Sequence, residues 1–406
     1  KSKGRNNAQG AVDELTPKKR NPSLHILAVG SADYAGAELD LQYAAKDARE
    51  MAAALEQVGK QLFVPAGGRV TVHLLTTDDS TPPTKTAIKV AFDTINAQAK
   101  AEDVVVVYFS GHGITYGDEA LFYYLTRDIG SFDDLGTPGV REKRAISSRE
   151  LTQWLKVIPP RKQVLILDAC NSGKMVEDLA AGKKALSASQ IRALDRLKDR
   201  TGMFVLAGSA ADKVSYEAGQ YGQGLLTFRL LQGMNGMALL DGKTVDVMTL
   251  FQDACNEVPE LAKGIGGIQR PMLVGPVKGS FPIGIKNEQV NIPIADPKPV
   301  FIRNVFMDEL TFDDGLGLTD ALEDHFRELT VKGAQAELIF VDVKEYPEAY
   351  AIKGQYKVKG EAVEVRGRLY KGKTNVGDEF KISGQKNDLP GLTNAIYEKV
   401  LELLKL

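Results

Sequence analysis

Short apolar runs alternate with helical patterns along most of the chain. The runs have the length of buried strands and cover residues 24–30, 69–75, 103–110, 163–168 and 203–209. Apolar positions at helical spacing lie at residues 41–58, 85–99, 148–157, 223–234 and 245–257. Strands that alternate with helices predict an α/β fold, in which a mostly parallel sheet is sandwiched by helices.

The pattern changes beyond the Pro-rich stretch NIPIADPKP at residues 291–299. Residues 349–384 alternate apolar and polar positions and carry Gly at turn positions, which predicts antiparallel hairpins. We expect a helix near 316–331, a strand at 336–343 and a closing amphipathic helix at 392–406. This part of the chain is predicted to form a small α+β domain.

These patterns divide the chain into four parts. Residues 1–22 are polar and basic, and we expect them to form a mobile leader or linker. The α/β domain is assigned to residues 23–287, the Pro-rich linker to 288–299 and the small α+β domain to 300–406.

Composition and charge limit the function classes. Hydrophobic residues make up 43% and charged residues 26% of the chain, which excludes wholesale disorder. The 51 basic and 53 acidic residues leave a formal charge of −2, which argues against a main role in coating nucleic acid or an anionic membrane. No apolar run approaches the ~20 residues of a membrane span. The two cysteines and four dispersed histidines have no metal-ligand spacing, so no metal site is predicted, and cytoplasm and periplasm both stay open as compartments.

Two predicted strands end in residues that carry chemistry. One runs into SGHG at residues 110–113, and the other into DACNSG at residues 168–173. If these strands are neighbours, Cys170 is placed as a nucleophile and His112 as the general base or acid that handles its proton. We expect glycines beside both residues to let the backbone turn sharply. The N–H groups of Gly113 and Cys170 are then the expected donors of an oxyanion hole.

The order, spacing and strand context of these two motifs resemble the caspase-like cysteine peptidases of the metacaspase and orthocaspase type. The resemblance covers roughly residues 23–285 and includes LAVGSADY, YAAKDA, AGSAADKVSYE and QRPMLVG. It implies a caspase-like fold and a cysteine endopeptidase that works through a thioester acyl-enzyme. It also implies that no organic cofactor or catalytic metal is required.

The resemblance also indicates the substrate. Asp168 lies two residues before the cysteine, where caspases that cut after aspartate carry glutamine. An acid there, with Asp212 as the matching second acid of this branch, would pair with an Arg or Lys side chain and repel Asp. The expected partner is therefore a peptide or protein with Arg or Lys before the scissile bond.

The segment 174–202 follows the cysteine and is rich in Lys and Arg. In the family this region joins a large and a small subunit, which indicates a zymogen that processes itself. The candidate self-cleavage sites are Lys183, Lys184, Arg192 and Arg196. The alternative is a solvated amphipathic helix, which the periodicity of IRALDRLKDR also fits.

Other residues have simpler interpretations. Trp154 is expected to be a packing anchor, and Cys255 a core residue. Some metacaspases require Ca²⁺, so Ca²⁺ activation stays open. However, the acidic pairs 78–79, 133–134 and 313–314 lack EF-hand spacing and fit solvated loops better.

The C-terminal part is similar to small α+β domains of TolB-like envelope proteins, and this similarity implies no chemistry. We expect it to recruit a substrate or protein partner; the alternative is an extension that covers a sheet edge. Two other functions stay open for the whole chain. One is a binding or scaffold protein that has lost proteolysis, and the other is a hydrolase or acyl transferase with a non-protein substrate.

Overall fold

The computed structural model describes most of the chain. The described ranges are 21–117, 121–170, 203–208, 218–264, 269–276, 279–294, 297–331, 336–346 and 348–405. Within them, no helix combines the length and the apolar composition that crossing a membrane requires.

A central sheet organises the first part of the chain. Among the described residues it has eight strands, six of which follow the order β2-β1-β3-β6-β7-β9. Their bounds are β1 Leu24–Gly30, β2 Val70–Thr76, β3 Val104–Tyr116, β6 Lys162–Cys170, β7 Met203–Ala207 and β9 Met272–Val274. All neighbours pair in parallel except β9, which is antiparallel to β7. The long β3 also pairs with β4 (Leu121–Leu125), which in turn pairs with β5 (Ala145–Ser147).

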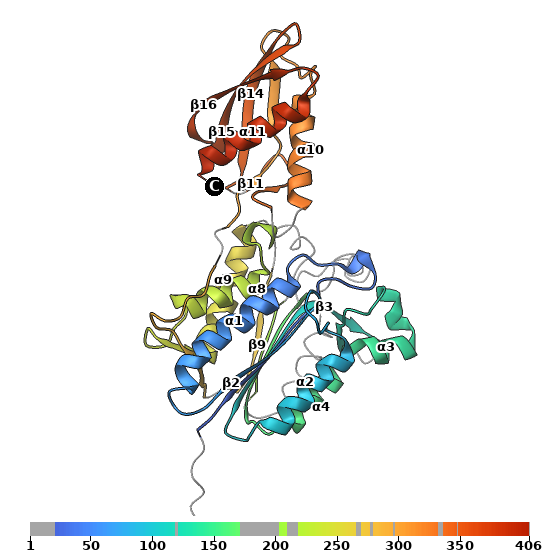
Figure 1. Ribbon diagram of the computed structural model, residues 1–406, viewed down its shortest axis with the longest axis vertical. Coiled ribbons are helices and arrows are strands. Elements are labelled where there is room, and N and C mark those ends of the chain that lie inside the picture. The colour runs from blue at the N-terminus through green and yellow to red at the C-terminus, as the bar shows by residue number, and fades with distance from the viewer. Residues whose placement is uncertain are drawn as a thin grey trace, which may run out of the picture.

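Helices cover both faces of this sheet (Figure 1). One face is covered by α1 (Ala44–Phe63), α8 (Leu225–Gln232) and α9 (Val247–Gly264). The other is covered by α2 (Lys85–Gln98) and α4 (Ser148–Val157). The run of valines in β3 is continuous because alternate residues enter both cores: Val106 and Tyr108 pack on the α1 side, and Val107 and Phe109 on the α2 side.

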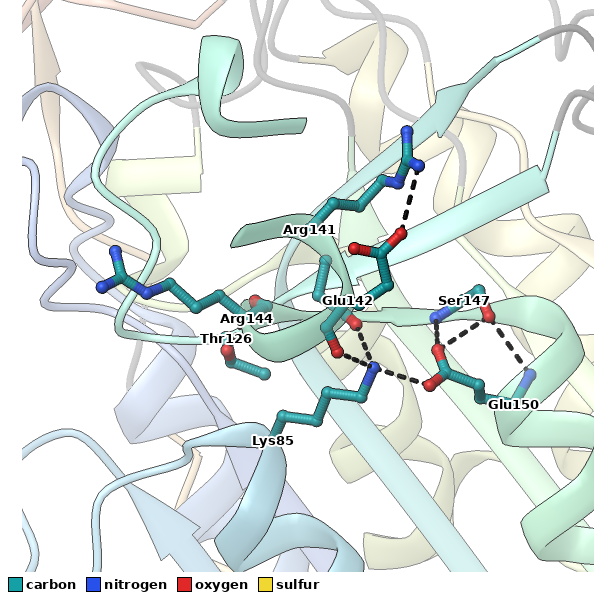
Figure 2. Close-up of polar contacts among 8 residues, drawn as sticks. Lys85, Thr126, Arg141, Glu142, Arg144, Ser147 and Glu150 are labelled. Carbon is teal, nitrogen blue, oxygen red and sulfur yellow. Dashed lines mark hydrogen bonds and ion pairs between the residues drawn. The ribbon is translucent and has the colours of Figure 1, made fainter. Parts of the chain in front are cut away.

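Lys85 ties the start of α2 to the segment before α4 (Figure 2). Its ammonium donates to the carbonyls of Glu142 (2.6 Å), in the short helix α3 (Pro138–Arg144), and of Ala145 (2.9 Å). It also forms an ion pair with Glu150 at 2.6 Å. Glu150 is the third residue of α4 and completes a capping box with Ser147. These partners of the Lys85 ammonium all lie within the chain, so we assign Lys85 a structural role in joining α2 to the start of α4.

A second sheet lies in the C-terminal part of the chain. Its described strands follow the order β13-β11-β14-β15-β16, with β12 paired to β14. Their bounds are β11 Val300–Phe301, β12 Val305–Asp308, β13 Ile339–Phe340, β14 Tyr350–Lys359, β15 Ala362–Lys371 and β16 Thr374–Gln385. Helices α10 (Leu318–Val331) and α11 (Leu389–Leu404) share one core with the inward side chains of this sheet. Among the described residues these strands pair only with one another, so the module does not extend the central sheet.

The fold class predicted from the sequence is confirmed. A caspase-like sheet sandwiched by helices is followed by a β-rich module with two helices. Several boundaries differ from the prediction, most clearly in two strands. The strand expected at residues 103–110 continues to Tyr116, and the strand expected at 336–343 is reduced to the two residues of β13.

Candidate active site

His112 and Cys170 lie opposite each other on neighbouring strands. Strands β3 and β6 pair in parallel, and the register matches His112 with Cys170. Parallel neighbours lie about 4.8 Å apart, so the two backbones meet at the carboxyl end of β6. The sequence predicted this only on the condition that the strands are adjacent, and the register meets that condition.

The glycines beside His112 do not make a turn, in contrast to the prediction. His112 lies inside β3, because the strand runs through the SGHG motif. Gly111 has a φ of +149°, and a Cβ built on it would lie 3.0 Å from the hydroxyls of both Tyr34 and Tyr124. A Cβ on Gly113 would lie 2.5 Å from the Phe122 ring. Both positions therefore need glycine because other groups pack directly against the strand.

The imidazole of His112 is buried and oriented by a backbone carbonyl. Its Nε2 lies 2.7 Å from the carbonyl oxygen of Leu39, at the end of the 3₁₀ helix η1 (Ala37–Leu39). A carbonyl oxygen only accepts, so Nε2 carries the proton and Nδ1 is the basic nitrogen. Burial lowers the pKa of His112, which the bond to Leu39 partly opposes. The ring is therefore neutral and basic near pH 7.

Aromatic rings hold this histidine in place. The Tyr34 ring centroid lies 5.1 Å from that of His112, and the Phe132 centroid lies 5.7 Å away. The backbone N–H of His112 donates to the Tyr34 hydroxyl at 3.0 Å. Leu39 and Tyr34 were missed as site residues, although Tyr34 belongs to a motif of the resemblance. Leu39 acts through its backbone carbonyl, which every residue has, so the sequence could not identify it.

Asp168 is buried beside the site, two residues before Cys170. Its Oδ2 accepts a hydrogen bond of 2.6 Å from the Thr227 hydroxyl, which lies 2.6 Å from the Tyr108 hydroxyl. Burial raises the pKa of Asp168, and these hydrogen bonds oppose the rise. The side chain is thus held in place at the inner side of the strand end.

A second carboxylate, Asp47 of α1, lies next to Asp168. Only 2% of Asp47 is exposed, and the Gly224 N–H donates to its two oxygens at 3.1 and 3.3 Å. A Cβ on Gly224 would lie 3.0 Å from an oxygen of each carboxylate, so both acids pack against this glycine. Burial raises the pKa of Asp47 well above its usual range, and the nearby Asp168 raises it further.

Asp47 and Asp168, hereafter the acidic pair, were only half predicted. Asp47 stands in the quoted YAAKDA motif, but no role was assigned to it. Its signal was an acid inside an apolar helical stripe, since Ala44, Ala48 and Met51 of α1 are all buried. The second acid expected from the sequence, Asp212, lies outside the described residues.

Glycines also limit bulk on the other side of Asp168. A Cβ on Gly208, just after β7, would lie 3.4 Å from Asp168 Oδ1 and 3.2 Å from the Gln269 amide nitrogen. Gly208 and Gly224 therefore both border the Asp168 carboxylate.

The other sequence predictions concern the self-cleavage sites, Trp154 and metal binding. The candidate self-cleavage sites Lys183, Lys184, Arg192 and Arg196 lie outside the described residues. Trp154 packs against Phe92 with ring centroids 5.4 Å apart, as expected of an anchor. Within the described ranges, no three His, Cys, Asp or Glu side chains are grouped to hold a metal. Of the two adjacent acids at 78–79, which were considered for Ca²⁺, Asp78 forms an ion pair with Arg49 at 2.7 Å.

The α/β part of the chain matches a known protein family. The family model for the caspase domain matches residues 24–279. The crystal structure of protein GSU0716 from Geobacter sulfurreducens is 16% identical, with a TM-score of 0.39, over 63% of this chain and 95% of that chain. No curated protein matches the chain. The family match includes His112, Cys170 and both members of the acidic pair.

Proposed function

Since the chain belongs to the caspase-domain family, we propose that it is a cysteine endopeptidase of the metacaspase or orthocaspase type that cleaves after Arg or Lys. The observation that carries the specificity is the buried acidic pair, whose two carboxylates pack against Gly224. Two buried acids close together repel each other when both are ionised, and an Arg or Lys side chain of the substrate would offset that repulsion.

The proposed reaction uses His112 as the proton carrier. Nδ1 of His112 takes the thiol proton of Cys170, and the thiolate attacks the carbonyl carbon of the scissile bond. The tetrahedral intermediate collapses as the carbon–nitrogen bond breaks, and the imidazolium gives its proton to the leaving amine. Water then hydrolyses the thioester, with His112 again as the base. The N–H groups of Gly113 and Cys170 are the proposed donors to the oxyanion.

The orientation of His112 supports this mechanism. The carbonyl of Leu39 fixes the Nε2–H tautomer, and burial keeps the ring neutral, so it is ready to accept a proton. The reaction requires no organic cofactor and no catalytic metal, and Ca²⁺ would act as an activator. Self-processing in the segment 174–202 would convert a zymogen to the active form.

A matched set of fluorogenic peptides tests this proposal. The peptides carry Arg, Lys, Asp or Ala before the scissile bond and are assayed with and without Ca²⁺, with Cys170→Ala as the control. We expect turnover of the Arg and Lys peptides only, and none by the folded Cys170→Ala variant. Cleavage after Asp would contradict the assigned specificity. Equal activity of the variant would refute the mechanism, and no cleavage of any peptide would favour a binding protein on a caspase-like fold.

A further inference from the structure

The C-terminal sheet has one uncovered face that carries basic side chains. Inward residues of β14, β15 and β16 share one core with α10 and α11. The opposite face presents Lys353, Arg366, Arg368 and Lys381, all of which are exposed. We call these four residues the basic face.

The basic face places like charges directly opposite each other. Lys353 of β14 is paired with Arg368 of β15, and Arg366 of β15 is paired with Lys381 of β16. Residues opposite each other in an antiparallel pair have neighbouring side chains, and like charges there are destabilising. Such pairs do not stabilise the fold, so binding of an anionic ligand is the explanation that we consider.

Among the described residues, only one member of the basic face forms an ion pair with an acidic side chain. Arg368 forms an ion pair with Glu379 at 3.6 Å. The Lys353 ammonium lies 5.3 Å from the centre of the Tyr370 ring. Across the described part of the chain, neither Arg366 nor Lys381 has an acidic side chain within ion-pair distance. The centre of the face therefore has cations available for carboxylates, and Arg can bind a carboxylate through two parallel hydrogen bonds.

We propose that the basic face binds an extended acidic segment of a protein partner. Glu364 and Glu379 interrupt the basic residues, so the face can pair with a few anionic groups but not with a continuous phosphate backbone. The face is also only three strands wide, and the whole chain has a formal charge of −2. These features favour a short acidic peptide over a nucleic acid or a membrane surface.

The position of the module gives this surface a role in the proposed reaction. Lys298, two residues before β11, donates its backbone N–H to the carbonyl of Gln220. Gln220 lies just before Gly224, which borders the acidic pair. The start of the module thus contacts the segment that leads into Gly224. The preferred substrate is inferred to combine a basic residue at the scissile bond with a separate acidic segment, and this second step rests on the proposed function.

A binding experiment tests the surface independently of catalysis. The probe is a fluorescein-labelled peptide of Asp and Glu that lacks Arg and Lys, and binding to the full chain is followed by fluorescence anisotropy. The variant Arg366→Gln/Lys381→Gln should bind about tenfold more weakly. Lys344→Gln/Lys373→Gln removes the same charge from exposed positions elsewhere in the module and should change the affinity less than about twofold. Equal weakening by both double variants, or no binding by the native chain, would overturn the proposal.

Two competitors separate the other anionic partners. A single-stranded oligonucleotide and phosphatidylserine vesicles are tested at matched charge and salt. Tighter binding of either one, lost in Arg366→Gln/Lys381→Gln, would assign the face to that partner and overturn the proposal. Weaker binding of both would support it.

Hydrolysis then tests the link to the active site. An Arg peptide is compared with the same peptide extended by an acidic tail. The tail should lower KM about tenfold in the native chain and not in Arg366→Gln/Lys381→Gln, whereas both proteins should cleave the untailed peptide equally. An unchanged KM would refute the role in substrate recruitment. Failure to cleave either peptide would instead refute the proposed function, and the binding result would stand.

Discussion

The acidic pair and the basic face both bring like charges together, but in opposite surroundings. Asp47 and Asp168 are 2% and 8% exposed, whereas the four cations of the basic face are exposed. Water screens repulsion between exposed charges, so their net contribution to stability is small. Burial removes that screening, and the proton affinity of the acids rises instead. Burial is thus the main cause of the raised pKa of both acids, and the nearby Asp168 adds to the rise at Asp47, whereas in the basic face like charges give only a weak destabilisation.

This difference separates two kinds of recognition. A buried acidic pair binds a cation strongly because little water screens the attraction. Such a pair therefore selects strongly for a basic side chain. On an exposed basic face each contact contributes less binding free energy. The affinity there depends on salt and on several contacts made at once. We therefore expect the first region to set which bond is cleaved and the second to set which protein is held.

The largest expected effect follows removal of one buried charge. Asp47→Asn should lower kcat/KM for Arg peptides roughly 10²–10³-fold, because one partner of the substrate cation is lost. The same variant should be more stable at pH 7, with a melting temperature about 2–4 °C higher, because the buried repulsion is gone. Peptide hydrolysis and thermal unfolding measure the two effects.

The stability gained by Asp47→Asn should depend on pH. The pKa of Asp47 is raised in the folded chain, so its contribution to stability is fully present below the unfolded value and is lost as pH rises through the folded value. The stability gained by Asp47→Asn should therefore vanish in acid. Asp93→Asn, at an exposed position of α2, is the matched control and should change neither property appreciably. A less stable Asp47→Asn variant at pH 7 would contradict the assigned repulsion.

Filling the space between the two carboxylates is expected to have the next largest effect. Gly224 has a φ of −63°, which alanine adopts freely, but its Cβ would lie 3.0 Å from both acids. Gly224→Ala should lower kcat/KM for Arg peptides about 10–100-fold by displacing the substrate cation. Gly139→Ala, where a Cβ meets nothing within 4 Å, controls for the change of residue type. Full activity of Gly224→Ala would show that the cation does not enter this space.

Titration of the acidic pair should then change specificity up to about tenfold per pH unit. The ratio of kcat/KM for an Arg peptide to that for its neutral citrulline analogue should rise with pH as the pair ionises. Any change in the protonation of His112 acts on both peptides equally and cancels from the ratio. The ratio should be nearly independent of pH in Asp47→Asn. A constant ratio in the native chain would mean that the pair does not contact the substrate cation.

The sequence predicts the central sheet well because β3 and β6 are buried on both faces and read as continuous apolar runs. It misjudges the SGHG motif, because a glycine required by Tyr34 and Tyr124 packing looks the same as a glycine required by a turn. The pairing of Asp47 with Asp168 could not be deduced, since it depends on how α1, β6 and Gly224 meet across long sequence separations. The basic face is hidden for a similar reason: strand register decides which lysines and arginines are neighbours.

The smallest expected effect belongs to the basic face. Arg366→Gln removes one member of the pair that it forms with Lys381, so the free energy of unfolding should rise by only about 0.2–1 kcal/mol at low salt. Salt should abolish the gain, because it screens the exposed repulsion in the native chain, whereas the gain from Asp47→Asn should persist in salt. Denaturant unfolding at two ionic strengths measures both. If the two variants responded equally to salt, the distinction between a buried pair that selects the bond and an exposed face that holds the partner would fail.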